Sequence, residues 1–306
     1  MVTSRIPPVN VTARNTRIIP IDFEYYEPRS LGEALEILDK YGEKARVLAG
    51  GTDLLVKIKA RLLEPSVLVN LKKIPGLSYV EEEGEFVKIG ALTRLRDLER
   101  SEVVAKHLPA LHDAVKAMGS VQIRNMATIG GNLCNASPAA DTAPPLLVHD
   151  AKVVVASVRG TRVIPLEEFF MGPGKTALEP NEILVEIVAK KAGVGSSAFK
   201  KVTRVSVDLA IASSAVYVKV EGDVISEARV ALGSVAPRPL RARRTESLLR
   251  GLRIGSRELR EALQALEGEI APITDVRATA EYRRHVAKVL TWEALNEAYT
   301  RVKGVK

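Results

Sequence analysis

Cysteine is almost absent from this chain of 306 residues, in which Cys134 is the single one. One thiol excludes a disulfide within the chain and an iron–sulfur cluster held by this chain alone, because such clusters usually need four thiolates. The four histidines lack the spacing of a metal site, and we interpret them as structural or surface residues: His107, His112, His149 and His285. No G-x-S-x-G motif is present. The sequence therefore indicates neither a metal centre nor a substrate nucleophile, and Cys134 is interpreted as a small buried packing residue.

Long apolar runs and aromatic residues are also scarce. No run approaches the 18 or more apolar residues of a membrane-spanning helix, and the first residues lack the apolar segment of a secretory signal, which favours a cytoplasmic protein. The net charge is +8, but lysines and arginines are interleaved with glutamates, apart from a cluster at residues 241–244. With only 4% aromatic residues there is little to stack on bases, so the charge is interpreted as a solvated surface rather than a nucleic-acid site.

The chain is long enough for two or three domains, each with a core of its own. Residues 1–16 mix Pro, Asn, Thr and Arg without periodicity and are expected to form a loose leader. A linker-like stretch without apolar anchors, residues 190–197, divides the rest. We therefore expect one domain at residues 17–190, with subdomains at about 17–75 and 76–190, and a second domain at residues 198–306.

Local patterns predict an α+β fold. Ser30 and Glu33 form a capping box, and apolar residues at helical spacing follow as far as Gly42, which predicts a helix. The first domain is further predicted to contain strands at 47–49, 67–71, 151–158, 162–165 and 182–188, a hairpin of residues 77–80 and 86–89, and helices at 54–60, from 93, and at 109–118. The second is predicted to contain a hairpin of residues 213–220 and 224–232 and helices near 256–266 and from about 277.

Two glycine-rich loops carry the functional signal. Residues 47–55 read VLAGGTDLL, and residues 128–141 read TIGGNLCNASPAAD. Paired glycines can adopt φ > 0 and let backbone N–H groups approach a ligand, and Ser137 with Pro138 can begin a helical turn. Converging N–H groups suit a phosphate, so two such loops about 80 residues apart point to a dinucleotide. Neither loop matches the Rossmann fingerprint or the P-loop.

These loops resemble the two FAD-binding loops of the medium, flavoprotein subunit of molybdenum hydroxylases, the family of carbon monoxide dehydrogenase, xanthine dehydrogenase and the archaeal aldehyde or glyceraldehyde oxidoreductases. The resemblance continues in AFKKVTRVSVDLA (198–210), LGSVAPRP (232–239) and DVRATAEYRRH (275–285), and covers nearly the whole chain from about residue 17. It implies a two-part FAD-binding domain of the PCMH (vanillyl-alcohol-oxidase-like) type, followed by a C-terminal α+β domain like that of the carbon monoxide dehydrogenase flavoprotein.

By this resemblance, the chain is expected to bind FAD non-covalently, to accept electrons from two [2Fe–2S] clusters on a small subunit, and to pass them to an external acceptor. A large subunit is expected to hold a molybdenum–pterin centre, in a dimer of heterotrimers. Backbone N–H groups of both loops would hold the diphosphate. The residues expected to bind FAD are Leu48, Ala49, Gly50, Gly51, Thr52, Asp53, Leu54, Met118, Thr128, Ile129, Gly130, Gly131, Asn132, Asn135, Asp141, Leu184 and Lys200.

Among these, the resemblance assigns Leu184 to the face of the flavin ring, Lys200 to its polar edge, and Met118 to a position where the family often has an aromatic residue. Each polar assignment has a structural alternative. Asp141 is equally interpreted as a carboxylate bound by local turn N–H groups, and Lys200 as a surface lysine.

Two other classes of protein stay open on the sequence. A self-contained flavin-dependent oxidoreductase of the same broad fold would have its own substrate cavity and often a flavin-linked histidine near the first loop, but residues 48–55 contain none. A nucleic-acid-binding protein would explain the charge alone and would lose binding steeply with salt. Flavin content and copurifying subunits separate the three classes.

Overall fold

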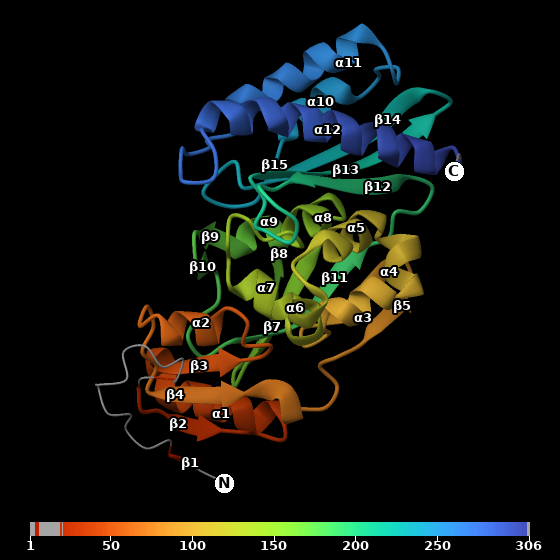
Figure 1. Cartoon of the computed structure of the whole chain (residues 1–306). Coiled ribbons are helices and arrows are strands. Elements are labelled where there is room, and N and C mark those ends of the chain that lie inside the picture. Colours follow the sequence, from red (N-terminus) through yellow and green to blue (C-terminus); the bar gives the residue numbers. More distant parts are fainter. Residues whose placement is uncertain (1–3, 6–18, 20, 305–306) are drawn as a thin grey trace.

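The computed structural model describes residues 4–5, 19 and 21–304, which form three layers that follow one another along the chain (Figure 1). Apart from β1 (Ser4–Arg5), the expected leader at residues 1–16 lies outside the described residues. Within the described part, no helix combines the length and the apolar character needed to cross a membrane.

The first layer is a small sheet with strand order β1-β2-β4-β3. Its other elements are β2 (Glu24–Tyr26), α1 (Leu31–Tyr41), the 3-10 helix η1 (Gly42–Lys44), β3 (Ala45–Leu48), α2 (Leu54–Lys59), β4 (Val67–Asn70) and the 3-10 helix η2 (Leu71–Lys73). Both β2 and β3 pair with β4 in parallel, so the chain must cross over between them, and α1 forms part of that crossover. Ser30 caps α1 by accepting the N–H of Glu33 at 3.2 Å, as the capping box predicts.

The second layer is a five-stranded antiparallel sheet with order β5-β6-β11-β7-β8, packed against short helices. Its elements are β5 (Val80–Glu83), β6 (Phe86–Gly90), α3 (Leu95–Arg100), α4 (Glu102–His107), α5 (Pro109–Ala117), α6 (Val121–Met126), α7 (Ile129–Cys134), α8 (Ala143–Val148), β7 (Lys152–Ser157), β8 (Gly160–Pro165), α9 (Leu166–Phe169), β9 (Phe170–Gly172), β10 (Lys175–Thr176) and β11 (Ile183–Lys190). Cys134 packs against the core of this layer, and burial raises the pKa of its thiol to about 12.

The third layer is an antiparallel sheet with order β12-β13-β14-β15 and four further helical segments. They are β12 (Ser196–Val202), β13 (Ala212–Glu221), β14 (Val224–Gly233), β15 (Leu240–Arg241), α10 (Arg243–Leu249), α11 (Arg257–Ala262), the 3-10 helix η3 (Leu263–Gly268) and α12 (Ala280–Val302). Helix α12 covers one face of the sheet, and α5 and α8 pack on the other (Figure 1). Along β12, Ala198 therefore belongs to the core under α12, and Phe199 belongs to the core of the second layer.

The predicted α+β class is confirmed, and the differences have local causes. The first hairpin strand lies at Val80–Glu83 rather than 77–80, because the turn is confined to Gly84, at φ +55°, and Glu85. The last helix begins at Ala280 rather than about 277, because Thr279 caps it by accepting the N–H of Tyr282. The short helices α4 and α6 to α10 were not predicted, because helices of seven residues or fewer often show too little of the 3.6-residue period.

Buried polar contacts join the second and third layers, and we call this contact the domain interface. The Nδ1–H of His149 donates to the carbonyl of Lys190 at 2.7 Å, so its Nε2 accepts the hydroxyl of Ser197 at 2.8 Å. The Ser197 hydroxyl in turn accepts the N–H of Ala110 at 3.0 Å. These bonds connect the ends of α8 and β11 with β12 and α5.

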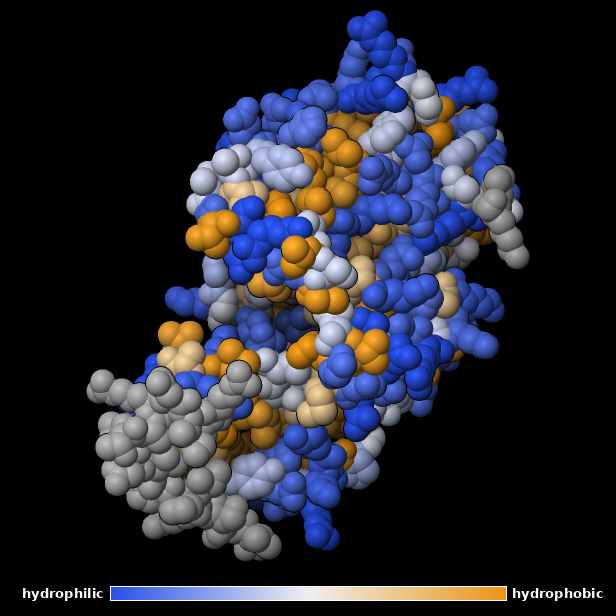
Figure 2. Space-filling view, viewed as in Figure 1, coloured by the Kyte–Doolittle hydropathy of each residue, from blue (hydrophilic) through white to orange (hydrophobic). Residues whose placement is uncertain are grey.

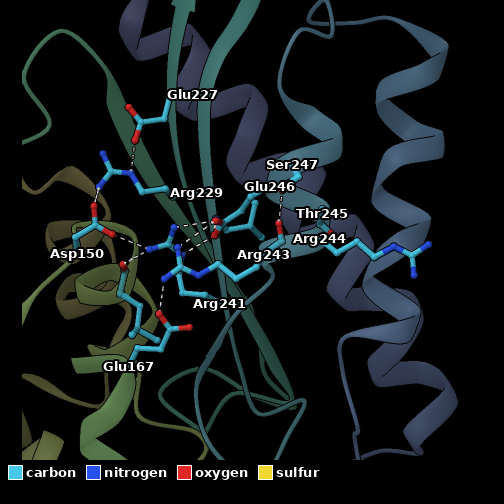
Figure 3. Close-up of polar contacts among 12 residues, drawn as sticks. Asp150, Glu167, Glu227, Arg229, Arg241, Arg243, Arg244, Thr245, Glu246 and Ser247 are labelled. Atoms are coloured by element: carbon cyan, nitrogen blue, oxygen red, sulfur yellow. Dashed lines mark hydrogen bonds and ion pairs between the residues drawn. The ribbon is translucent and has the colours of Figure 1, made fainter. Parts of the chain in front are cut away.

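An ionic network completes the domain interface (Figure 3). The buried Arg241 donates to Glu246 through Nε at 2.5 Å and Nη2 at 2.9 Å, and to Asp150 through Nη1 at 2.8 Å. Arg229 of β14 also donates to Asp150, at 2.6 Å. Because Asp150 precedes β7 and both arginines belong to the third layer, the network fastens one domain to the other.

Candidate functional site

The first glycine loop connects β3 to α2 and packs directly on the chain that enters the second loop. A Cβ atom on Gly50 would lie 2.2 Å from the carbonyl oxygen of Met126 and 2.9 Å from the Cα of Ala127, so only glycine fits. Gly51 has φ +78°, a conformation that glycine adopts without strain. The first loop is therefore in contact with the residues that lead into the second loop, and we call this contact the loop interface.

The first loop offers backbone donors to a ligand. The N–H groups of Gly50, Gly51 and Thr52 make no hydrogen bond to another described residue. Helical bonding begins only with Leu55, whose N–H donates to the carbonyl of Gly51 at 3.0 Å. Three consecutive unpaired N–H groups suit an anionic oxygen such as that of a phosphate.

The second loop differs from the prediction. Gly130 and Gly131 lie inside α7 rather than at φ > 0, and Thr128 caps that helix by accepting the N–H of Gly131 at 3.1 Å. The N–H of Gly130 donates to the carbonyl oxygen of Ala91 at 2.9 Å, and a Cβ atom on Gly130 would lie 2.7 Å from the same oxygen. These glycines therefore allow α7 to pack closely, and their N–H groups already have acceptors. Ser137 begins only a single turn, in which its hydroxyl accepts the N–H of Ala139.

Side-chain amides supply donors in the second loop, where the N–H groups of the paired glycines do not. The hydroxyl of Thr142 donates to Asn132 Oδ1 at 2.6 Å, and Lys57 Nζ donates to Asn135 Oδ1 at 2.6 Å. The NH2 groups of both asparagines have no partner in the part of the chain that the structure describes. The sequence patterns did not single out Lys57, although its position on α2, just after the first loop, places it near the expected diphosphate.

Asp141 is buried beside Lys201 and is not bound by local turn N–H groups. Lys201 Nζ lies 2.8 Å from Asp141 Oδ2, and Oδ1 has no partner among the described residues. Burial raises the pKa of Asp141, and the charge of Lys201 opposes that effect. Lys200 lies on the opposite face of β12, where it pairs with Glu297 of α12. Since successive strand residues face opposite sides, the lysine that shares a site with Asp141 is Lys201, which was also missed.

The remaining predicted residues lie in or beside the same region. Leu184 of β11 is buried in the same core as the apolar residues of α7, and the partly buried Met118 packs against that core. Leu48 and Ile129 are buried, Ala49 and Leu54 are half-buried, and Asp53 is exposed.

Figure 2 shows a hollow that lies over α7 in the matching view of Figure 1. Helix α2 lies on one side of it, and the loop after β12, residues 203–210, lies on the other. Both carry exposed apolar side chains, among them Val56, Val205 and Leu209. Hydrogen-bond donors near apolar side chains suit a ligand with an anionic part and an aromatic part.

A cavity of about 290 Å³ is lined by Ser137, Leu209 and Arg283, among others. None of its lining residues belongs to the first glycine loop, so it is not the site expected for a diphosphate.

Comparison with known families gives two matches that divide the chain. The model described as "FAD binding domain in molybdopterin dehydrogenase" matches residues 21–189. The model described as "CO dehydrogenase flavoprotein C-terminal domain" matches residues 197–298. The first match contains both glycine loops, and the second begins beside the first residue of β12.

Relatives match over nearly their whole length. The chain is 36% identical to the carbon monoxide dehydrogenase medium chain of Hydrogenophaga pseudoflava, over 93% of this chain and 99% of that one. It is 34% identical to the glyceraldehyde dehydrogenase medium chain of Sulfolobus acidocaldarius, over 91% and 99%. Among solved structures, the Hydrogenophaga pseudoflava enzyme matches with a TM-score of 0.89 over 93% of this chain and 99% of that one. The quinoline 2-oxidoreductase of Pseudomonas putida 86 matches at 27% identity, with a TM-score of 0.87 over 92% and 98%.

Proposed function

Because the chain belongs to the FAD-binding medium-subunit family of molybdopterin dehydrogenases, we propose that it is the electron-transfer subunit of a molybdenum hydroxylase. Membership confirms the resemblance seen in the sequence motifs, and it makes the chain a flavoprotein subunit of an oxidoreductase with a two-domain fold. In the proposed role, the chain takes electrons from [2Fe–2S] clusters of a small partner and delivers them to an external acceptor.

The loop interface is the observation that carries this proposal. Gly50 brings the first loop against the chain at Met126 and Ala127. The first loop has unpaired backbone N–H groups, and Asn132 and Asn135 of the second loop have NH2 groups without a partner in the described chain. Donors to an anion thus come from both loops, and the charge of Lys57 also acts on Asp53 of the first loop. The residues present therefore fit the diphosphate of FAD.

We propose a division of roles among the predicted residues. Gly50, Gly51 and Thr52 would hold the diphosphate through their N–H groups. Leu184 would pack on the flavin ring, and Lys201, rather than Lys200, would act with Asp141 at its polar edge. FAD supplies the redox chemistry when bound, and the chain supplies its position and electrostatic surroundings.

The partners follow from the named relatives. One matching structure is a carbon monoxide dehydrogenase that lacks the Mo-pyranopterin moiety of its molybdenum cofactor, and another is a Cu,Mo-CO dehydrogenase. We propose that this chain likewise assembles with a large molybdenum-binding subunit and a small iron–sulfur subunit, as a dimer of heterotrimers in the cytoplasm. We also place the domain boundary between β11 and β12, at residues 191–195.

A visible absorption spectrum of the purified full chain tests the proposal. We expect flavin absorption bands at roughly 370 and 450 nm, as in other flavoproteins. Acid precipitation should release FAD into the supernatant, because the first loop contains no histidine to link it. A colourless chain that also refuses added FAD would contradict the proposal, and copurifying subunits with molybdenum and iron would support the assembly.

A further inference from the structure

A side-chain hydrogen bond links α2 to the residue that follows α7. Lys57 lies on α2, shortly after the first glycine loop, and Asn135 follows the last residue of α7. Lys57 Nζ lies 2.6 Å from Asn135 Oδ1, although the two residues are 78 positions apart in the sequence. Lys59, on the same helix, is exposed and makes no such contact with the described chain.

The chemistry of this contact fixes which way the amide faces. An ammonium group can only donate hydrogen bonds, so the amide atom facing Lys57 must be the oxygen. The planar amide then turns its NH2 group away from Lys57, where it has no partner within the described chain. Thr142 holds the oxygen of Asn132 in a similar way, through its hydroxyl. Both asparagines thus present donors to the site.

These donors matter because the backbone N–H groups at the start of α7 already have acceptors. The N–H of Ile129 donates to the carbonyl of Thr93, that of Gly130 to Ala91, and those of Gly131 and Asn132 to Thr128. This first turn of α7 can therefore donate to an anion only through side chains. If the amide of Asn135 turned over, its oxygen would face the phosphate oxygens, and two acceptors would oppose each other.

We infer that Lys57 is a positioning residue for FAD, which orients the amide of Asn135 so that its NH2 group faces the diphosphate. The inference rests on the proposed function and goes beyond it, because Lys57 lies outside both glycine loops. A residue of the first subdomain thus determines whether Asn135 presents a donor or an acceptor to the diphosphate. Lys57 need not touch the cofactor for this effect.

The test measures the dissociation constant of FAD for the deflavinated full chain by flavin fluorescence, in wild type, Lys57→Met, Asn135→Ala and the double variant. Lys59→Met is the matched control. We expect Lys57→Met to weaken FAD binding about tenfold, and Lys57→Arg, which restores a donor, to recover most of the loss. In the Asn135→Ala background, Lys57→Met should change the affinity less than about twofold, because the group it orients is absent.

Each other outcome has a distinct meaning. Equal affinity in Lys57→Met and Lys59→Met would overturn the inference, and so would additive losses in the double variant, which would mean that Lys57 acts on FAD directly. Riboflavin, which lacks the diphosphate, serves as the second ligand. Parallel losses of riboflavin and FAD would assign the effect to a general defect of the site and would also overturn the inference. A wild-type chain that takes up no FAD would instead overturn the proposed function.

Discussion

The two interfaces of this chain are built in opposite ways. At the domain interface, most of the polar groups named above are paired: Arg241 donates through all three of its nitrogens, and His149 uses both ring nitrogens. The exception is Arg229 Nε, which has no hydrogen-bond partner among the described residues but lies 3.0 Å from a carboxylate oxygen of Glu227. At the loop interface, the N–H of Gly50 and the NH2 groups of Asn132 and Asn135 have no partner within the described chain.

This difference separates a contact that holds the fold from one that receives a ligand. A buried donor or acceptor without a partner costs about 1–3 kcal/mol, so folded chains leave donors unpaired mainly where water or a ligand completes them. The domain interface is nearly complete without a ligand. The donors at the loop interface are half-buried, and in the proposed function the diphosphate of FAD accepts them. Changes at the first should therefore affect stability, and changes at the second should affect FAD binding.

The largest effect is expected from breaking the ionic network of the domain interface. Arg241→Met leaves the buried carboxylate of Glu246 without its guanidinium partner. Loss of one member of a buried pair typically costs about 3–5 kcal/mol. Urea unfolding of the deflavinated chain should show a loss of this size, with FAD affinity changed much less in whatever fraction stays folded.

A neighbouring arginine provides the control. Arg243 is exposed and pairs with Glu167, and its Nη1 lies 3.7 Å from Glu246 Oε2, beyond hydrogen-bond distance, so Arg243→Met should cost no more than about 1 kcal/mol (Figure 3). The double variant Arg241→Met with Glu246→Leu should recover much of the stability, because no charge is left buried alone. Equal losses from the two single arginine variants would show that burial does not distinguish the pairs.

A second prediction concerns the pH dependence of the domain interface. Burial is the main cause that lowers the pKa of His149 to about 4. The hydrogen bond from its Nδ1–H to the carbonyl of Lys190 acts in the opposite direction and raises the pKa. The unfolded chain takes up a proton near pH 6.5, whereas the folded chain does so only near pH 4. The contribution of His149 to stability is therefore complete above about pH 6.5 and is lost as the pH falls to 4. The loss should be about 3 kcal/mol.

The measurement compares unfolding free energies of wild type and His149→Gln at pH 7 and pH 4.5. The variant is expected to be less stable at pH 7, because glutamine does not reproduce both ring contacts, but the difference from wild type should shrink toward acid pH. A difference that stays constant across this range would mean that His149 does not carry the acid sensitivity of the interface.

The sequence predicted where the two glycine-rich segments lie better than it predicted their backbone conformation. Paired glycines marked both loops, and at Gly51 the expected positive φ is present. The same reasoning was wrong at Gly130 and Gly131, because Thr128 starts a helix there and the glycines serve close packing against Ala91. A glycine pair in the sequence does not reveal whether it is needed for a positive φ or for close packing.

The other omissions depend on long-range geometry. Lys57 meets Asn135 only because the first subdomain folds against the second, and no local pattern contains that contact. The choice between Lys200 and Lys201 depends on which face of β12 lies under α12, and two adjacent lysines in the sequence leave it open. What could be predicted was local conformation, and what could not was the pairing of distant side chains.

Controls aside, Gly50→Ala is expected to have the smallest effect on stability of the three changes. It is also the sharpest test of the difference between the two interfaces. The added Cβ would lie 2.2 Å from the backbone oxygen of Met126, so the loops must separate, at a cost of about 2 kcal/mol. Gly32→Ala, in α1 with no atom within 4 Å of the new Cβ, should keep or slightly raise stability and leave FAD binding unchanged. Unlike Arg241→Met, Gly50→Ala should weaken FAD binding even where the chain stays folded, because the donors of the two loops no longer face one anion. Full FAD affinity in folded Gly50→Ala would mean that close contact of the loops serves packing alone, and the distinction between the two interfaces would then fail.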